Sequence, residues 1–249
     1  MKPEEIKTIG IMGGGVMGGG IAQVLAVGGY HPIVRDLTQD LLDKTRATIV
    51  DGRFGLKAGV QRGKLSEAEM EAALSRIDFT TDMADLRDVD LLIEAIPEDL
   101  ELKRKVFAEL DNLIRPEAIF ATNTSGFAIA DLNQAVSRKD RFGGMHWFSP
   151  VPAMKLVEVI YSPETSEETV ACIEAAGTKA GKVTIRVKDA PGKYGFIANR
   201  IYYAAVAEAR KILEEGIASA DDINKAMVYG FNWPVGPLAM TAGARSGWG

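Results

Sequence analysis

Residues 8–22 read TIGIMGGGVMGGGIA, a short apolar run followed by dense glycine. Gly13, Gly15 and Gly18 have the G-x-G-x-x-G spacing, and Asp36 follows Gly18 by eighteen residues, shortly after a second apolar run. A strand, a glycine turn, a helix and a downstream acid within one unit of about thirty residues indicate a dinucleotide-binding site. The alternative is a purely structural glycine turn.

Each glycine of the motif has a physical role. The sharp turn after the strand needs a residue without a Cβ at Gly13. Gly15 lets backbone N–H groups approach a pyrophosphate, and Gly18 lets the next helix lie close to the sheet. The N-terminus of that helix offers unpaired N–H groups and a partial positive charge to phosphates. The predicted phosphate-binding turn consists of Gly13, Gly14, Gly15, Val16, Met17 and Gly18.

Asp36 bears on the choice of cofactor. At the end of the second strand its carboxylate is placed to accept hydrogen bonds from the adenosine ribose hydroxyls. A carboxylate there repels a 2′-phosphate, so NAD is expected rather than NADP, although the adjacent Arg35 acts in the opposite direction.

The uncharged stretch that contains the motif has two other readings. Residues 8–34 carry no Asp, Glu, Lys or Arg, as in a membrane span with a Gly-x-x-x-Gly dimerisation face. However, nine of the twenty residues from 10 to 29 are glycine, and each costs a helix about 0.5–1 kcal/mol relative to Ala. A signal peptide is disfavoured by Glu4 and Glu5 and by the glycines in its apolar core. We therefore expect no membrane partner.

The composition argues against several other classes of protein. The 249 residues are 47% apolar and 25% charged, as in an ordinary globular protein. A net charge of −5 argues against nucleic acid as the main partner. The single cysteine, Cys172, excludes an internal disulfide and fits a reducing cytosol, so a cytoplasmic location is expected. No metal site is predicted.

Strand and helix patterns alternate along most of the chain, as in a doubly wound α/β sheet of the Rossmann type. Further strands are expected at 91–96, 118–121, 142–148, 156–161 and 183–187, with a helix at 167–179. Residues 1–188 are therefore predicted to form a Rossmann-like NAD-binding domain. Residues 189–249 are predicted to form a short all-helical C-terminal domain. It is too short to be stable alone and must pack on the sheet domain, on a second copy, or on both.

A helical hairpin is expected as an insertion after the second strand. Thr38 can cap a long helix that runs from about Gln39 into the sixties, although four glycines weaken its far end. Ser66 and Glu69 form a capping box that opens a second helix. If the first helix persists, one basic face contains Arg46, Arg53, Lys57 and Lys64. This face is either a solvated surface or an arm that meets a polyanionic ligand.

The sequence offers only two histidines as general bases. His31 begins the second strand, at the end opposite the cofactor, and is interpreted as structural. His146 ends an apolar strand, and Glu158 lies twelve residues later, flanked by valines in another strand. A buried carboxylate is costly unless it is paired, and a His–Glu pair would fix the imidazole tautomer and raise its basicity. The alternative is a structural core histidine whose hydrogen bonds are made within the protein, beside an unrelated glutamate.

Over nearly its full length the chain resembles the short-chain L-3-hydroxyacyl-CoA dehydrogenases, which include the 3-hydroxybutyryl-CoA dehydrogenases. The matching segments are GGGVMGGGIA (13–22), EAIPE (94–98), TNTS (122–125), HWFSPVP (146–152), MKLVEVI (154–160), GFIANR (195–200) and WPVGPL (233–238). They come in the family's order and at its separations, so the match is far more specific than the glycine motif. It favours the catalytic interpretation of His146 and Glu158.

The resemblance implies reversible NAD-dependent oxidation of a (3S)-3-hydroxyacyl-CoA to a 3-oxoacyl-CoA in fatty acid β-oxidation. His146 would take the proton from the 3-hydroxyl while C3 gives hydride to the nicotinamide, and Glu158 would orient His146. Ser125 and Asn199 would position the hydroxyl and the thioester carbonyl. The residues implied to contact the cofactor after the strands are Glu98, Lys103, Asn123, Ser125 and Ser149. The family also implies a homodimer formed through the helical C-terminal domain.

Three departures from the family pattern stand out. Ser149 occupies a position near the nicotinamide where the family often has Asn. A Ser and a Lys that contact CoA in some members fall on Gly52 and Gly59, so Arg53 or Lys57 would have to bind the substrate instead. Family members usually continue for several more helices, so we expect the C-terminal domain to be truncated or the protein to assemble differently.

Two competing functions stay open. A dehydrogenase on the same scaffold could act on a free hydroxy acid or sugar acid. The chain could also be a non-catalytic NAD-binding protein in which the short C-terminus has removed turnover. The presence of His146, Glu158, Ser125 and Asn199 argues against the second.

Overall fold

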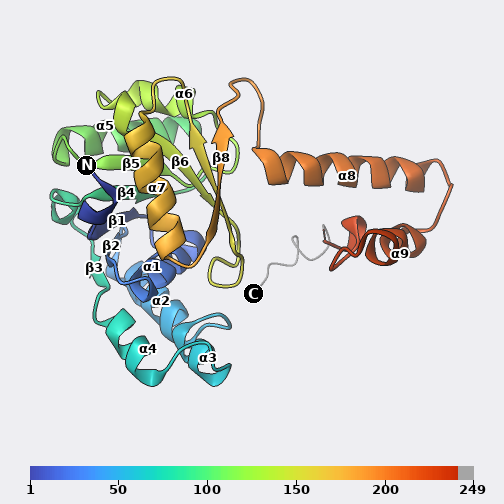
Figure 1. Cartoon of the computed structure of the whole chain (residues 1–249), viewed down its shortest axis with the longest axis horizontal. Helices are drawn as coiled ribbons and strands as arrows, with labels where there is room; N and C mark the ends of the chain where they lie inside the picture. The colour runs from blue at the N-terminus through green and yellow to red at the C-terminus, as the bar shows by residue number, and fades with distance from the viewer. Residues whose placement is uncertain (241–249) are drawn as a thin grey trace. The chain divides into compact units, whose positions relative to one another are not determined.

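The computed structural model describes residues 1–240 of the chain (Figure 1). The chain divides into two compact units, Met1–Tyr194 and a second that begins at Gly195. Across the described residues, no helix combines the length and the apolar character needed to cross a membrane.

One mostly parallel sheet forms the centre of the first unit, which confirms the predicted Rossmann-type fold. Its strands are β1 (Thr8–Met12), β2 (His31–Arg35), β3 (Asp78–Thr80), β4 (Leu91–Glu94), β5 (Ile119–Thr122), β6 (Phe142–Trp147), β7 (Leu156–Tyr161) and β8 (Val183–Lys188). The spatial order is β3-β2-β1-β4-β5-β6-β7-β8, and only the β6–β7 pair is antiparallel. The carboxyl ends of β1, β4 and β5 therefore lie next to one another, at the edge where ligands bind in open α/β sheets.

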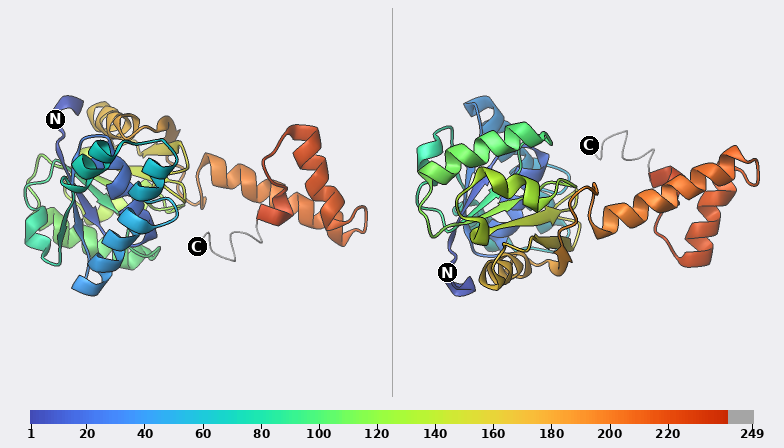
Figure 2. Two further views of the ribbon diagram at one scale, coloured as in Figure 1. Left: turned by 90° about the horizontal axis from the view of Figure 1, so that it is seen from below. Right: turned by 90° about the horizontal axis from the view of Figure 1, so that it is seen from above.

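Helices cover both faces of this sheet, and α5 and α7 lie on opposite sides of it (Figure 2). The longer helices of the unit are α1 (Val16–Val27), α2 (Gln39–Asp51), α3 (Leu56–Gln61), α4 (Glu67–Leu74), α5 (Leu100–Leu113) and α7 (Glu167–Lys179). Shorter turns lie at η1 (Pro3–Glu5), η2 (Met83–Leu86), α6 (Ile129–Leu132), η3 (Asn133–Ala135) and η4 (Lys139–Arg141). On one face Phe107 of α5 packs on Phe120 and Phe142, with ring centroids 6.0 and 4.8 Å away.

The central strands are buried along their whole length. Every residue of β4, β5 and β6 is buried, because helices cover both faces of a parallel sheet. Buried polar groups need hydrogen-bond partners. The polar side chains within these apolar runs, Glu94, Thr122 and His146, are therefore the residues whose partners define the site.

The helical insertion differs from the predicted single long helix. Helix α2 ends at Asp51, and a separate helix α3 begins after Gly55. The prediction of a helix that runs from Gln39 into the sixties is therefore wrong, and the condition for one basic face from Arg46 to Lys64 is not met. The reason is the pair of glycines: the helix stops at Gly52, where the backbone becomes extended, and Gly55 is the N-cap of α3. The predicted cap at Thr38 and the capping box at Ser66 are confirmed.

The second unit contains α8 (Ile197–Glu214) and α9 (Ala220–Phe231), as the helical pattern predicted. Gly216, shortly after the end of α8, adopts φ +68°, a conformation that favours glycine. Ser219 caps α9 by accepting a hydrogen bond from the Asp222 N–H at 3.1 Å. Residues 241–249, the end of the predicted C-terminal domain, lie outside the described residues.

Candidate active site

The glycine turn has the geometry that the motif predicted. Gly13 has φ +101°, and a Cβ there would lie 2.8 Å from the Ala95 carbonyl oxygen. A Cβ on Gly18 would lie 1.8 Å from the Gly13 carbonyl oxygen, so only glycine lets α1 approach the turn this closely. Nothing lies within 4 Å of a Cβ built on Gly15, which precedes the first residue of α1. The turn therefore presents open space directly at a helix N-terminus, where anions bind.

Asp36 is fixed beside this turn. Its Oδ2 accepts the Gly14 N–H at 2.8 Å, and its Oδ1 accepts the Leu37 N–H at 2.6 Å. A cavity of about 650 Å³ opens here, between the ends of β1, β2 and β4 and helix α5. Leu37 and Leu102 line it and are 72% and 39% exposed, so apolar surface is available for a flat ring. Arg35 lines the same cavity, and its buried Nε has no hydrogen-bond partner among the described residues.

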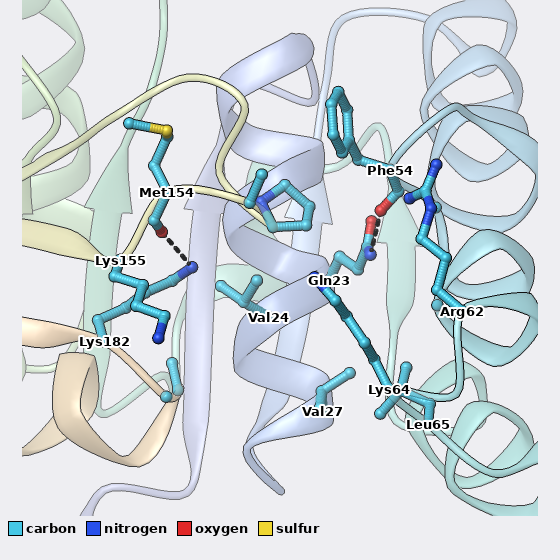
Figure 3. A pocket seen from close by; sticks show the side chains of 16 residues that line it. Gln23, Val24, Val27, Phe54, Arg62, Lys64, Leu65, Met154, Lys155 and Lys182 are labelled. Carbon is cyan, nitrogen blue, oxygen red and sulfur yellow. Dashed lines mark hydrogen bonds between the residues drawn. The ribbon is translucent and has the colours of Figure 1, made fainter. Parts of the chain in front are cut away.

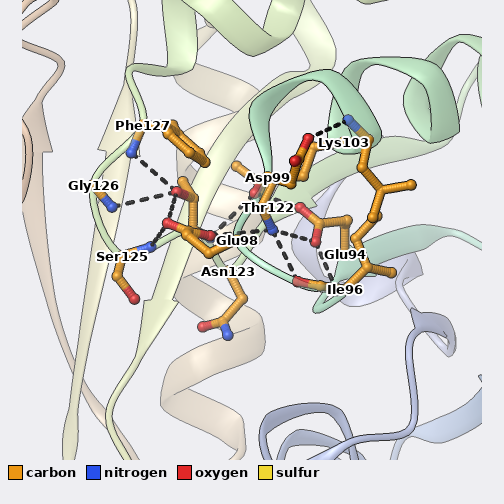
Figure 4. A network of polar contacts seen from close by, with 12 residues as sticks. Glu94, Ile96, Glu98, Asp99, Lys103, Thr122, Asn123, Ser125, Gly126 and Phe127 are labelled. Atoms are coloured by element: carbon orange, nitrogen blue, oxygen red, sulfur yellow. Dashed lines mark hydrogen bonds and ion pairs between the residues drawn. The ribbon is translucent and has the colours of Figure 1, made fainter.

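A polar network joins the ends of β4 and β5 to α5 (Figure 4). Lys103 Nζ lies 2.6 Å from Glu94 Oε1 and 3.3 Å from Glu98 Oε2. Thr122 Oγ1 donates to Glu94 Oε2 at 2.7 Å. Burial raises the pKa of the Glu94 carboxyl, while Lys103 and the hydrogen bonds to the carboxylate act in the opposite direction.

The same network positions the loop after β5. Thr124 Oγ1 and the Ser125 N–H both donate to Glu98 Oε1, at 2.6 and 2.8 Å. Asn123 Oδ1 accepts the Trp147 N–H at 2.9 Å, which ties this loop to the end of β6. Asn123 and Ser125 are thus held beside the strand that carries His146.

His146 and Glu158 form a buried pair. The residues are direct partners in the antiparallel β6–β7 ladder, and His146 Nδ1 lies 2.7 Å from Glu158 Oε2. His146 is 4% exposed and Glu158 is 0% exposed. The sequence predicted that this carboxylate needs a partner, and the structure supplies the imidazole. A carboxylate on Nδ1 selects the tautomer in which Nε2 carries the lone pair.

The other predicted site residues fall in two places. Ser149 is exposed and follows β6 in the loop that leads to β7. Asn199 lies in the first turn of α8, in the second unit. The sequence predicted Ser149 at the cofactor and Asn199 at the substrate, and these placements stay predictions.

The helical insertion borders a second cavity, of about 420 Å³ (Figure 3). Among the described residues, its lining contains four cations and no carboxylate: Arg62, Lys64, Lys155 and Lys182. Neither Arg53 nor Lys57 lines it; Arg53 lies over the Phe54 ring, and Lys57 pairs with Asp51 at 2.7 Å. Lys64 belongs to the basic face that the sequence predicted, whereas Arg62, Lys155 and Lys182 were missed, because no helical periodicity connects the three segments that carry them.

Lys182 is the most buried cation of this cavity. Its Nζ donates to the carbonyl oxygens of Val151 and Met154 at 2.6 and 2.8 Å, which fastens the loop between β6 and β7. Burial lowers the pKa of Lys182 to about 8. The cavity therefore carries charge that is expensive to bury and that an anion would stabilise.

Comparison with known proteins identifies the family of this site. Residues 8–190 match the family model of the 3-hydroxyacyl-CoA dehydrogenase NAD-binding domain, and residues 195–245 match the model of its C-terminal domain. The chain belongs to the 3-hydroxyacyl-CoA dehydrogenase family. The predicted resemblance is confirmed, as are the predictions of an NAD-dependent dehydrogenase and of NAD as its cofactor.

Individual members of the 3-hydroxyacyl-CoA dehydrogenase family are similar along most of the chain. A probable 3-hydroxybutyryl-CoA dehydrogenase of Deinococcus radiodurans is 41% identical over 231 residues, which cover 93% of this chain and 81% of that protein. The mitochondrial hydroxyacyl-coenzyme A dehydrogenase of Rattus norvegicus is 40% identical over 238 residues, covering 94% and 75%. The crystal structure of (S)-3-hydroxybutyryl-CoA dehydrogenase from Ralstonia eutropha superposes with a TM-score of 0.90 at 41% identity, covering 95% and 81%.

Proposed function

We propose that the chain catalyses the reversible NAD-dependent oxidation of a (3S)-3-hydroxyacyl-CoA to the 3-oxoacyl-CoA. The observation that carries the proposal is the buried His146–Glu158 pair, with 2.7 Å between Nδ1 and Oε2, on strands that adjoin the nucleotide-binding edge of the sheet. The names of the relatives, which are 3-hydroxybutyryl-CoA and hydroxyacyl-CoA dehydrogenases, support the substrate class.

In this mechanism His146 is the general base. Glu158 holds Nδ1, so Nε2 takes the proton from the substrate's 3-hydroxyl as C3 loses its hydride. The imidazolium that forms is stabilised by the Glu158 carboxylate, and the same pair returns the proton in the reverse direction. Such general-base assistance typically contributes about 10²–10⁴-fold. NAD, when bound, supplies the hydride acceptor.

We assign the cofactor to the glycine-turn edge of the first unit. The phosphate-binding turn is residues 13–18, and Asp36 accepts the adenosine ribose hydroxyls. Toward the nicotinamide, the proposed contacts are Glu98, Lys103, Asn123, Ser125 and Ser149. Gly15 supports this assignment, because the space beside its Cα is unfilled.

Ser125 and Asn199 are proposed to position the substrate. Ser125 is half-buried and has its backbone N–H fixed on Glu98, which leaves its hydroxyl to meet the substrate hydroxyl. Asn199 would hold the thioester carbonyl from the helical domain. The domain roles follow: residues 1–188 bind NAD, and residues 189–249 contribute to substrate binding and to a homodimer.

The CoA portion is proposed to lie against the helical insertion. CoA carries a pyrophosphate and a 3′-phosphate, and the cationic cavity there holds Arg62, Lys64, Lys155 and Lys182 without a carboxylate. Arg53 and Lys57, the residues predicted from the sequence, are proposed as peripheral contacts. We further propose a cytoplasmic role in fatty acid oxidation, in keeping with the buried free thiol of Cys172.

Steady-state kinetics test the proposal. The chain should oxidise 3-hydroxybutyryl-CoA with a kcat/KM far above that for free 3-hydroxybutyrate. Similar values for both would favour the second candidate, a dehydrogenase of a free hydroxy acid or sugar acid. It is kept because Gly52 and Gly59 stand at positions where some members of the family have CoA-contacting side chains. Tight NADH binding without turnover of any acyl-CoA would favour a non-catalytic NAD-binding protein.

A further inference from the structure

The loop after β5 carries Ser125, and two different parts of the chain hold it. Near Ser125 the backbone is fastened by side chains close by. The Ser125 N–H donates to Glu98 Oε1 at 2.8 Å, and the Phe127 N–H donates to Thr124 Oγ1 at 3.0 Å (Figure 4). The second hold comes from residues 189–194, which follow β8 and end the first unit. We call this segment the linker.

Asp189, the first residue of the linker, binds the far end of the Ser125 loop. Its Oδ2 accepts the Ala130 N–H at 2.8 Å, and its own N–H donates to the Tyr161 carbonyl oxygen at the end of β7, also at 2.8 Å. Asp189 is 7% exposed, and its Oδ1 is buried without a hydrogen-bond partner within residues 1–240. An unpartnered buried oxygen costs stability. What the carboxylate supplies is therefore the hydrogen bond to the loop.

Tyr194, the last residue of the linker, contacts the middle of the same loop. Its ring meets the Phe127 ring edge to face, with centroids 6.0 Å apart and an interplanar angle of 83°. Its hydroxyl donates to Glu98 Oε1 at 3.4 Å, the oxygen that also accepts the Ser125 N–H. Tyr194 is 56% exposed, so its ring covers the loop from the solvent side and does not fill the core.

We propose that the linker holds Ser125 in position for the substrate. Asp189 and Tyr194 are the positioning residues, and they fasten the loop at Ala130 and at Phe127, both on the C-terminal side of Ser125. With these contacts in place the Ser125 hydroxyl keeps one direction. The inference rests on the proposed function, because that function assigns the substrate hydroxyl to Ser125, and it adds the two linker residues to the machinery.

Steady-state kinetics of Tyr194→Ala test this role. Loss of the ring releases the loop at Phe127, and kcat for 3-hydroxybutyryl-CoA should fall about tenfold, because a small displacement of a positioning group lowers the rate steeply. KM should stay near the wild-type value, since the CoA portion is proposed to bind at the cationic cavity. Tyr194→Phe keeps the ring and is the matched control, with kcat close to that of the wild type. A wild-type kcat in Tyr194→Ala would overturn the proposal.

A double-mutant cycle tests whether Tyr194 acts through Ser125. The kcat/KM for 3-hydroxybutyryl-CoA is measured for the wild type, Tyr194→Ala, Ser125→Ala and the double variant. Once the Ser125 hydroxyl is gone, its position no longer matters, so the double variant should agree with Ser125→Ala within about twofold. If the two losses multiply, Tyr194 acts by another route and the proposal is wrong.

The Asp189 contact has its own matched pair of variants. Asp189→Asn keeps an oxygen that can accept the Ala130 N–H, so its kcat should be close to that of the wild type. Asp189→Ala removes this acceptor and should lower kcat. Equal kcat values in the two variants would contradict the role of Asp189. If Asp189→Ala does not fold, the test at this end is Asp189→Asn, and a large loss of kcat in it would contradict the role.

Limited proteolysis tests the hold of the linker without any substrate. Lys193 is exposed and lies directly before Tyr194, so trypsin can cut there when the linker opens locally. Cleavage after Lys193, followed by mass spectrometry of the fragments, should be about two- to tenfold faster in Tyr194→Ala than in Tyr194→Phe, the scale of one aromatic pair. Equal rates would overturn the proposal. A chain that does not oxidise 3-hydroxybutyryl-CoA would contradict the proposed function, and the cleavage rates would still decide whether the linker is held.

Discussion

His146 and Glu158 face each other across one rung of the antiparallel β6–β7 ladder, with 2.7 Å between Nδ1 and Oε2. The two residues are twelve apart in sequence, and the strand register rather than a flexible loop holds their side chains together. Glu158 is 0% exposed, and the imidazole supplies a hydrogen-bond partner for its carboxylate inside the sheet. Rigid strand pairing would pre-orient the proposed base before any substrate arrives.

Replacement of the imidazole should remove the general base. His146→Gln is expected to lower kcat for 3-hydroxybutyryl-CoA by about 10²–10⁴-fold, because the glutamine amide cannot take a proton. The Kd for NADH should stay near the wild-type value. Stopped-flow or steady-state assays of NADH formation give the first quantity and fluorescence titration gives the second. Turnover like that of the wild type would exclude His146 from the mechanism.

Removal of the Glu158 carboxylate should lower kcat by changing the tautomer of His146. In Glu158→Gln an amide group faces Nδ1 and can donate to it, which favours the proton on Nε2 and blocks its role as base. We expect kcat to fall by about 10²-fold or more. Glu167→Gln, which alters an exposed glutamate paired with Arg186, is the control and should have full activity. A Glu158→Gln enzyme as active as this control would contradict the orienting role.

The carboxylate at the end of β2 should determine cofactor preference. Asp36→Ala removes the proposed acceptor for the ribose hydroxyls together with the bonds to the Gly14 and Leu37 N–H groups. NADH should bind about tenfold more weakly. The affinity for NADPH should increase, because the repulsion of its 2′-phosphate is gone and Arg35 remains. Titrations with both nucleotides measure the ratio. Asp78→Ala, at an exposed pair with His31, is the control, and an unchanged ratio in Asp36→Ala would refute this assignment.

The cationic cavity should contribute to the binding of CoA and not to the chemical step. Arg62→Gln and Lys64→Gln are each expected to raise KM for 3-hydroxybutyryl-CoA several-fold at unchanged kcat, since uniform binding affects KM alone. The effect should shrink as salt concentration rises. The same substitutions at Arg53 and Lys57, which do not line the cavity, should have smaller effects. If substitution of Arg53 and Lys57 raised KM more than substitution of Arg62 and Lys64, the CoA contact would lie at Arg53 and Lys57, as the sequence predicted.

Lys182 should make stability depend on pH. Burial lowers its pKa from 10.5 to about 8, so between these values the unfolded chain binds the proton and the folded chain does not. The contribution of Lys182 to the free energy of unfolding therefore rises with pH across this window. Urea denaturation at about pH 7.5 and pH 9.5 gives the free energy of unfolding of the wild type and of Lys182→Met. The wild-type value minus the Lys182→Met value should be larger at pH 9.5. A difference that is constant with pH would contradict the lowered pKa.

Local patterns in the sequence predicted most of the elements. Gly13, Gly15 and Gly18 are constrained by short-range sterics, so their spacing alone indicated the turn and the cofactor. The helix caps at Thr38 and Ser66 were equally predictable, because a cap involves only neighbouring residues. The predicted far end of the first hairpin helix is wrong: α2 ends before Gly52, the first of the four glycines within residues 52–63 that weaken this end.

The Rossmann-type fold, the NAD-binding turn and the one histidine at the end of a buried strand were predictable from local sequence patterns, since each pattern depends on residues close in the chain. That β7 runs antiparallel to β6, so that Glu158 pairs with His146, is visible only in the three-dimensional structure. The tertiary structure also decided that Glu94, Lys103 and Glu98 close into one network, and that cations from three segments share a cavity. These relationships depend on strand register and on packing between distant segments, where burial makes each unpaired charge costly and so selects its partner.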